Sequence, residues 1–173
     1  VFREWAPNAK EIYLIGDFND WKEHGDYRMY HVKNSPGVWE VELQSGAIKH
    51  GDLYKLKVRW NGGEGERIPA WANRVVQDEQ TKIFSAQVWE PENPYRFRKK
   101  VFRAKTDPLM IYECHIGMAQ EEERVGTYNE FREKILPRIA EAGYNCIQIM
   151  AIQEHPYYGS FGYHVSSFFA ASS

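Results

Sequence analysis

The sequence predicts a mostly β fold, in which a β-sandwich is followed by one strand–helix–strand unit of an α/β sheet or barrel. Short alternating runs separated by turn residues fill residues 1–90. A proline-containing, basic stretch occupies residues 91–108, and the order then changes to strand, helix, strand over residues 109–173. These three changes of pattern predict a β domain, a linker and a second domain.

The first region contains four strand-like runs, at residues 2–7, 11–18, 37–43 and 53–60. Asn-Asp, Ser-Pro-Gly and Asn-Gly-Gly turn signals separate them, which is the spacing of a β-sandwich. The last run alternates most cleanly, with one face formed by Tyr54, Leu56, Val58 and Trp60 and the other by Leu53, Lys55, Lys57 and Arg59.

Residues 91–108 combine three prolines with a cluster of lysines and arginines. Such a basic run could bind an acidic partner. A solvated linker is the simpler interpretation, because proline and charge both disfavour a packed core. We therefore expect residues 91–108 to connect the two domains.

The second region predicts a helix between two apolar strands, at residues 109–117 and 144–152. Thr127 and Glu130 have the spacing of a capping box, and Gly143 can end the helix. Phe131, Ile135 and Ile139 form its apolar stripe, and Pro137 should kink or divide it. A parallel strand pair joined by a helix implies an α/β sheet or barrel.

Composition excludes several function classes. The formal net charge of −2 gives no electrostatic case for nucleic acid, and no run approaches the length of about 20 apolar residues that a membrane span needs. Cys114 and Cys146 lie in apolar runs without a CxxC neighbour, so we expect buried reduced thiols, no zinc or other metal site, and a cytoplasmic location.

Aromatic residues are unusually frequent, at 15% of the chain. Aromatic side chains build cores first, so packing explains most of them. The more specific interpretation is carbohydrate contact, since flat aromatic faces suit the apolar faces of sugar rings.

The runs FREWAPNAKEIYLIGDFNDW, GVWEVEL, GDLYKLKV and IPAWA together resemble the starch- and glycogen-associated carbohydrate-binding module. The resemblance covers nearly all of residues 1–90 and implies an immunoglobulin-like β-sandwich. It also implies a glucan platform at Trp21 and Trp60, with Lys55 and Asn61 as hydrogen-bond donors beside it. We expect the other tryptophans of this resemblance, Trp5, Trp39 and Trp71, in the core or at an interface.

The runs IYECHIG and GTYNEFREKILPRIAEAGYNCIQIMAIQEHPYYGSFGYHVSSFFAASS resemble the start of the alpha-amylase superfamily barrel, in the subgroup of branching enzymes. The resemblance implies an incomplete (β/α)8 barrel over residues 109–173 and a retaining transglycosylase that cuts α-1,4 bonds and forms α-1,6 branches. It implies no metal or organic cofactor, and an α-glucan (glycogen, amylose or starch) as the partner. The catalytic carboxylates are expected beyond residue 173, so residues 1–173 alone should be inactive and at most bind glucan.

Tyr163 is the strongest site candidate in the second region. In the superfamily, the matching tyrosine stacks under the sugar ring next to the bond that is cut. His155, Tyr157 and Tyr158 are expected to line the same cleft, and His164 stands where the family often has glutamine.

Glu113, His115 and Glu154 lie near strand ends, where barrel enzymes place their active sites. The family places its catalytic carboxylates elsewhere. We therefore expect Glu113 and Glu154 to shape loops through hydrogen bonds, and the spacing of Glu154 and His155 does not match a zinc motif.

Two other functions remain open from the sequence. One is a debranching or trehalose-forming hydrolase of the same superfamily, which carries the same module. The other is a non-catalytic glucan-binding or scaffold protein. The run MAIQEHPYYGSFGY favours branching over the first, and the open strand–helix–strand unit argues against the second.

Overall fold

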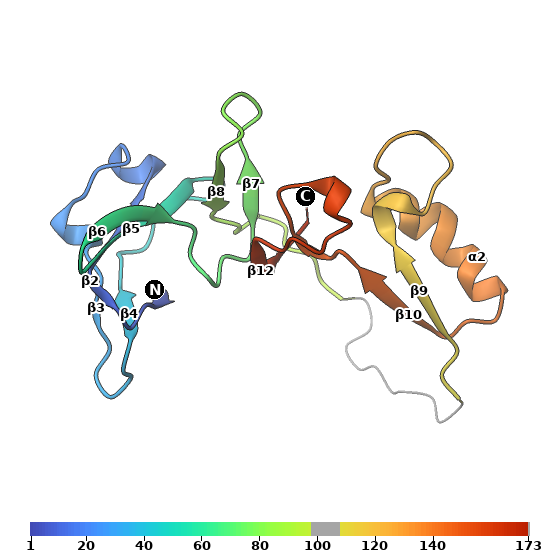
Figure 1. Ribbon diagram of the computed structural model, residues 1–173, viewed down its shortest axis with the longest axis horizontal. Helices are drawn as coiled ribbons and strands as arrows, with labels where there is room; N and C mark the ends of the chain where they lie inside the picture. Colours follow the sequence, from blue (N-terminus) through green and yellow to red (C-terminus); the bar gives the residue numbers. More distant parts are fainter. Residues whose placement is uncertain (98–107, 173) are drawn as a thin grey trace. The chain divides into compact units, whose positions relative to one another are not determined.

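The computed structural model describes residues 1–97 and 108–172, which form two compact units (Figure 1). One unit comprises Val1–Pro94 with Ser166–Ser173, and the other comprises Tyr95–Val165. Most of the expected linker, residues 98–107, lies outside the described residues.

The first unit contains two antiparallel sheets. One has the order β1-β4-β3, from β1 (Phe2–Trp5), β3 (Tyr30–His31) and β4 (Val38–Val41). The other has the order β2-β5-β8-β7, with β6 also paired to β5, from β2 (Ala9–Gly16), β5 (Leu53–Trp60), β6 (Gly63–Arg67), β7 (Val75–Gln77) and β8 (Phe84–Gln87). Two short 3₁₀ turns, η1 (Asp17–Asn19) and η2 (Gly25–Tyr27), follow β2, and β12 (Ser167–Ala171) completes the unit.

Strand β5 organises the larger sheet. Strand β2 pairs with β5 from Gly16↔Tyr54 to Ala9↔Trp60, and β8 and β6 share its other edge. The predicted alternation is confirmed, because Tyr54 and Leu56 are buried while Lys55 and Lys57 remain partly exposed. The core joins both sheets through Ile12, Leu14, Trp39, Val41, Tyr54 and Leu56.

Of the three tryptophans expected in the core or at an interface, one lies in the core. Trp39 is in the core with 4% of its surface exposed, and its Nε1 donates to the Ala6 carbonyl at 3.0 Å. Trp5 and Trp71 are 59% and 47% exposed, so of the two expected positions, core or interface, the core is excluded for them. Position 5 lies one residue beyond buried Glu4 in β1, and the pleat therefore turns its side chain to the outer face.

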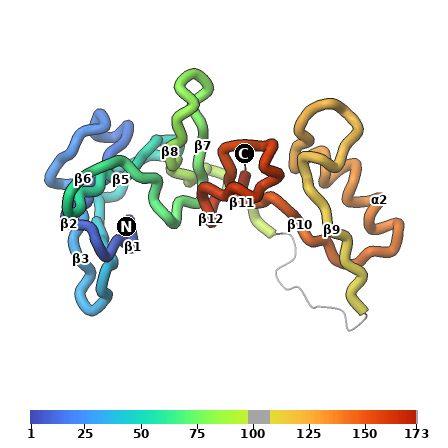
Figure 2. The backbone as a smooth tube through the Cα atoms, in the orientation of Figure 1, coloured from blue at the N-terminus to red at the C-terminus, as the bar shows by residue number. Residues whose placement is uncertain are grey.

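The second unit has the predicted strand–helix–strand order. Strands β9 (Ile111–His115) and β10 (Cys146–Met150) pair in parallel from Cys146↔Ile111 to Met150↔His115. A short turn, η3 (Ile116–Met118), begins the loop of residues 116–127 that leads from the end of β9 to the helix (Figure 2). After β10 come β11 (Gln153–Glu154) and the turn η5 (Tyr158–Ser160).

The helix has three consecutive parts because of Pro137. An α-turn, α1 (Tyr128–Glu130), leads into a π-helical turn, η4 (Phe131–Ile135), and then into α2 (Leu136–Glu141). Proline has no N–H to continue the i→i−4 ladder, and the wide π turn directly before it absorbs the break, with the Leu136 N–H donating to the Phe131 carbonyl. The predicted apolar stripe is confirmed, since Phe131 and Ile139 are buried against β9 and β10.

The expectation that β9 is a buried strand is wrong for most of its length. Cys114 is buried against the helix, and burial raises the pKa of its thiol, with Glu113 adding to the effect. Leu109, Met110 and Ile111 are each at least half exposed. Within the described residues the sheet of β9 has two strands, so one helix covers only one of its faces.

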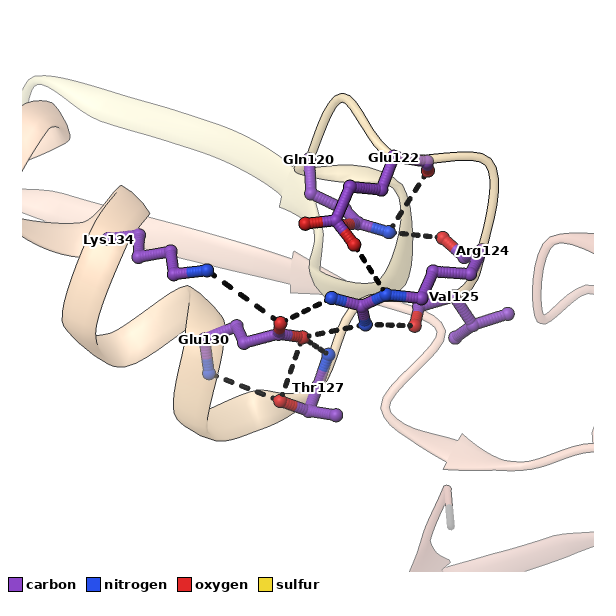
Figure 3. A network of polar contacts seen from close by, with 7 residues as sticks. All are labelled: Gln120, Glu122, Arg124, Val125, Thr127, Glu130 and Lys134. Atoms are coloured by element: carbon purple, nitrogen blue, oxygen red, sulfur yellow. Dashed lines mark hydrogen bonds and ion pairs between the residues drawn. The ribbon is translucent and has the colours of Figure 1, made fainter.

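The predicted capping box is present at the start of the helix (Figure 3). The Thr127 hydroxyl accepts from the Glu130 N–H at 3.2 Å, and the Glu130 carboxylate accepts from the Thr127 N–H at 3.0 Å. Arg124 donates to the same carboxylate, with Nη1 at 3.0 Å from Oε2. The Arg124 guanidinium, followed by the Thr127 N–H, lowers the pKa of Glu130 from 4.5 to about 2.

We predict that this network makes the helix acid-sensitive. The folded-state pKa of Glu130 lies below its ordinary value, so the stabilisation is present above about pH 4.5 and is lost as the pH falls toward about 2. Glu130→Gln should lower the protection factors of the amides over residues 131–141 at neutral pH, and should weaken the further loss of protection that the parent chain shows in acid. Glu133→Gln, which removes an exposed ion pair with Arg132 in the same helix, is the matched control. Equal pH profiles for Glu130→Gln and the parent chain would contradict the prediction.

Candidate functional site

The segment GDFNDW forms a rigid corner after β2, in the first unit. Gly16 lies so close to β5 that a Cβ there would be 2.3 Å from the Leu53 carbonyl oxygen, which explains the glycine. The Asp17 carboxylate accepts from the Leu53 N–H at 2.8 Å with one oxygen and from the Trp21 Nε1–H at 3.0 Å with the other. A single aspartate therefore ties the corner to β5 and fixes the indole ring.

Asn19 closes the same corner from inside. Its amide donates to the Leu14 carbonyl at 3.0 Å, and its oxygen accepts from the Gly16 N–H at 2.9 Å. Asp20 and Trp21 then adopt left-handed backbone angles, with φ of 54° and 59°. Aspartate tolerates this conformation better than most residues, whereas a tryptophan there is strained.

Trp21 is 37% exposed, and the Lys55 ammonium lies 6.0 Å from its ring centre. Lys55 is also 3.3 Å from the Glu66 carboxylate on β6, which holds its long side chain in place. An exposed indole with a lysine donor beside it is suited to a sugar ring, because the ring face and the hydroxyl groups can be contacted together. The structure thus brings together two residues that the sequence singled out, Trp21 and Lys55.

Trp60 lies on the other face of the same sheet. Positions 55 and 60 have opposite parity along β5, so their side chains point to opposite sides of the pleat. The Trp60 ring packs over Gly63, and the Arg67 guanidinium lies 5.1 Å from its centre. Asn61 lies in the exposed turn that follows β5. The structure therefore does not join Trp21 and Trp60 into one platform.

Sequence reasoning missed an ion-pair network on the Lys55 face. Arg59 donates to Glu64 at 3.0 Å, to Glu23 at 2.7 Å and to Glu11 at 3.0 Å. These hydrogen bonds, with Glu64 the largest contributor, raise the pKa of Arg59. Glu23 follows Trp21 closely in the chain, so the network anchors the loop after the indole. The alternating charges of Lys55, Lys57 and Arg59 opposite two glutamates were the available signal.

The second cluster lies in the other unit, where the end of β9 meets the segment after β10. Tyr158 packs between two histidines, with ring centres 5.7 Å from His115 and 5.9 Å from His155. The Tyr158 hydroxyl lies against Gly117, where a Cβ would be 1.8 Å from it. His155 is buried, and its Nδ1 is 2.9 Å from the Gln153 carbonyl oxygen. The structure therefore places both His155 and Tyr158 in one polar cluster, together with His115.

Burial favours the neutral forms of His115 and Tyr158 in this cluster. Burial first and His155 second lower the pKa of His115, and burial raises the pKa of Tyr158. Both ring nitrogens of His115 and the Tyr158 hydroxyl are buried without a hydrogen-bond partner within the described residues. Neutral imidazole and phenol groups can donate to or accept from hydroxyl groups, but they supply neither a carboxylate nucleophile nor a carboxylic acid.

Tyr163 is separate from the cluster and is 79% exposed. Its N–H donates to the Ser160 carbonyl at 3.0 Å, which closes the turn before it. The preceding Gly162 has φ of +81°, and a Cβ there would be 2.4 Å from the Ala151 Cβ, so the turn requires glycine. Tyr157 is also exposed. The loop thus presents Tyr163 to solvent while Tyr158 and His155 hold its base.

Glu113 and Glu154 make the hydrogen bonds expected of residues with structural roles. The Gln148 amide donates to Glu113 at 2.8 Å between positions that face each other across β9 and β10. Buried Glu154 accepts from the His155 N–H at 3.2 Å.

No group of three or more His, Cys, Asp or Glu side chains among the described residues could hold a metal ion. Of the helices formed by residues 1–97 and 108–172, none has the length and apolar character needed to cross a membrane.

The chain has clear similarity to known proteins. Residues 1–72 match the family described as carbohydrate-binding module 48 (isoamylase N-terminal domain). Over 99% of its length the chain is 41% identical to a 1,4-alpha-glucan-branching enzyme of Dictyostelium discoideum, of which it covers 26%. Over its full length it is 45% identical to relatives from Rhizophagus irregularis and Arabidopsis thaliana, covering 26% and 22% of them. The chain therefore spans about a quarter of the length of these curated relatives.

Solved structures show the same fold at lower identity. The pullulanase from Bacillus acidopullulyticus matches 99% of the chain with a TM-score of 0.73 and 16% identity, and 24% of that protein is covered. Pullulanase type I from Bacillus subtilis matches 99% with a TM-score of 0.67 and 18% identity, and 26% of it is covered. At these identities the likeness shows the fold alone.

We predict that the corner after β2 tolerates no side chain at position 16. Gly16→Ala would place a methyl group against the Leu53 carbonyl, and the clash should cost about 1–3 kcal/mol of unfolding free energy. Gly25→Ala is the control, because nothing lies within 4 Å of a Cβ there. Urea denaturation followed by tryptophan fluorescence measures both. Equal midpoints for the two variants would show that the corner is not tightly packed.

Proposed function

We propose that the protein containing this chain is a 1,4-alpha-glucan-branching enzyme, which forms α-1,6 branches in glycogen or a starch-like glucan. The observation that carries this proposal is identity of 41–45% to branching enzymes across essentially the whole chain, including both structural units. The reaction is a retaining transglycosylation, in which a carboxylate nucleophile holds the cut chain before a 6-hydroxyl accepts it. We place the catalytic carboxylates in parts of the protein outside residues 1–173.

For the first unit we propose α-glucan binding through Trp21 and Lys55. The match to carbohydrate-binding module 48 includes both residues. Asp17 fixes the indole before any ligand arrives, so little side-chain entropy remains to be lost on binding. Trp60, on the opposite face of the sheet, can contribute only to a separate contact.

For the second unit we propose that Tyr163 stacks on a sugar ring of the donor chain. Its exposure leaves the phenol face open to a ligand. Tyr158 and His155 then act by holding the loop that presents Tyr163, through the packing of Tyr158 against Gly117.

A debranching or other hydrolase of the superfamily is the second candidate. The pullulanases that share the fold are too distant in sequence to favour it. We also propose a cytoplasmic location, although the Arabidopsis relative is named as a chloroplastic/amyloplastic enzyme.

The decisive experiment uses the full-length protein and amylose. A branching enzyme creates α-1,6 linkages, seen as new anomeric signals in the proton NMR spectrum, with no net gain of reducing ends. A debranching enzyme instead releases reducing ends from pullulan. The 173-residue chain alone should do neither. New α-1,6 signals from the short chain would contradict our placement of the catalytic carboxylates.

We predict that Trp21→Ala weakens retardation of the 173-residue chain in glycogen-containing gels by about three- to tenfold, from the loss of one stacked aromatic ring. Lys55→Ala should produce a smaller loss. Trp60→Ala should leave this contact unchanged, because its ring packs on the other face of the sheet. Retardation that is unchanged in Trp21→Ala, with the far-UV spectrum retained, would remove Trp21 from the site.

We predict that Tyr163→Ala in the full-length enzyme lowers kcat/KM for amylose by roughly 10- to 100-fold, because the scissile bond loses its orienting contact. Tyr163→Phe keeps the aromatic face and should stay within about threefold of the parent. Tyr95→Ala is the control, since Tyr95 in the same unit is equally exposed. Equal losses in the Ala and Phe variants would argue against stacking.

A further inference from the structure

The first unit contains a groove that neither Trp21 nor Lys55 lines. Its volume is about 750 Å³, and it lies between the start of β1, the segment after β6 and the segment after β8. Two exposed tryptophans, Trp71 and Trp89, stand on it, 47% and 49% exposed. Polar side chains accompany them, including Arg3, Asn73 and Glu90.

The backbone on both sides of Trp71 is fixed. Buried Glu4, 6% exposed, accepts from the Ala70 N–H at 2.7 Å and from the Trp5 N–H at 2.8 Å. Ala72 is itself buried in the core. Burying a carboxylate is energetically unfavourable. The buried Glu4 carboxylate nevertheless holds the loop that carries the exposed Trp71 indole. Core packing alone does not require that arrangement.

Trp89 is held by a second set of contacts. The Arg74 guanidinium lies 4.1 Å from the ring centre, and Arg74 Nε donates to the Gln87 amide oxygen at 2.8 Å. The Gln87 amide donates in turn to the Gly51 carbonyl at 3.1 Å. His50 packs edge-on at 4.8 Å and accepts from the Glu90 N–H at 3.0 Å. The indole is therefore oriented while half of its surface stays open.

The arginines beside the groove do not favour an anionic ligand. Arg3 is paired with Glu40, and Arg74 is stacked on Trp89 and bonded to Gln87, so these two lining or flanking arginines are already engaged. The exposed Asn73 and Glu90 side chains offer a donor and acceptors to hydroxyl groups. Fixed indole faces with a few polar groups beside them suit the apolar faces and hydroxyl rims of sugar rings.

We infer that this groove is a second α-glucan site of the module, in which Trp71 and Trp89 contact sugar rings of one chain. The inference rests on the proposed glucan binding of the module and adds a site separate from Trp21. Two sites on one module would hold a branched or folded polymer more tightly than either site alone, through effective concentration.

The test is an NMR titration of the 173-residue chain with maltoheptaose, followed through the indole N–H signals of its six tryptophans. We expect the Trp71 and Trp89 signals to move together with one apparent Kd. The Trp21 signal should follow its own curve. If Trp21 titrates while Trp71 and Trp89 stay fixed up to its saturation, the second site is wrong and the proposed function stands. If none of the signals moves, glucan binding by the module fails as well.

Variants separate the ligand from other occupants of the groove. Trp71→Ala should weaken the Trp89 titration about three- to tenfold and leave the Trp21 curve unchanged. Ile83→Ala, which removes an equally exposed apolar side chain outside the groove, should change neither curve. Sedimentation at several concentrations tests a second copy as the occupant. A dimer lost in Trp71→Ala, without a glucan effect, would overturn the inference.

Discussion

The first unit depends on the strict two-residue period of β5. Strands β2, β6 and β8 all pair with it, so its register fixes which side chains face the core and which face solvent. Leu56 closes the core on one side, while Lys55 and Arg59 stand on the other with their carboxylate partners. A slip of one residue would bury the cations and expose the leucine. Because such a slip is unfavourable, the packing of the core also fixes Lys55 on the face of the sheet where it contacts Trp21.

The same period explains where sequence reasoning worked and where it failed. Alternation in β5 was visible in the sequence, and with it the burial of Tyr54 and the outward position of Lys55. Trp60 was grouped with Trp21 because both resemble platform residues, yet parity along β5 separates Trp60 from Lys55, and Lys55 is the neighbour of Trp21. A resemblance to a family identifies which residue types match its binding residues. The pleat of β5 determines which of these side chains lie on the same face of the sheet.

Other features depend on contacts distant in sequence, which no local pattern reveals. The capping box at Thr127 and the apolar stripe through Phe131 are local and were predictable. The hydrogen bonds from Leu53 to Asp17 and from Ala70 to Glu4 join positions 36 and 66 residues apart. In the sequence these contacts are visible only as an aspartate in a turn motif and a glutamate in a strand, and neither residue indicates its distant partner. The exposure of β9 was missed because an apolar run predicts a buried strand without stating what covers it.

Both units hold exposed aromatic rings through hydrogen bonds or tight turns, and one of these supports, Glu4, is buried. Asp17 fixes Trp21, Glu4 fixes the loop of Trp71, and the turn at Gly162 presents Tyr163. A ring that only filled space would pack inward and would need no such support, since burial alone stabilises it. Holding an indole or phenol in one orientation against solvent reduces the entropy that a ligand must remove on binding. Strain at Trp21 and a buried carboxylate at Glu4 therefore accompany preformed aromatic surfaces, and this arrangement supports the proposed binding of long, flexible polysaccharide chains.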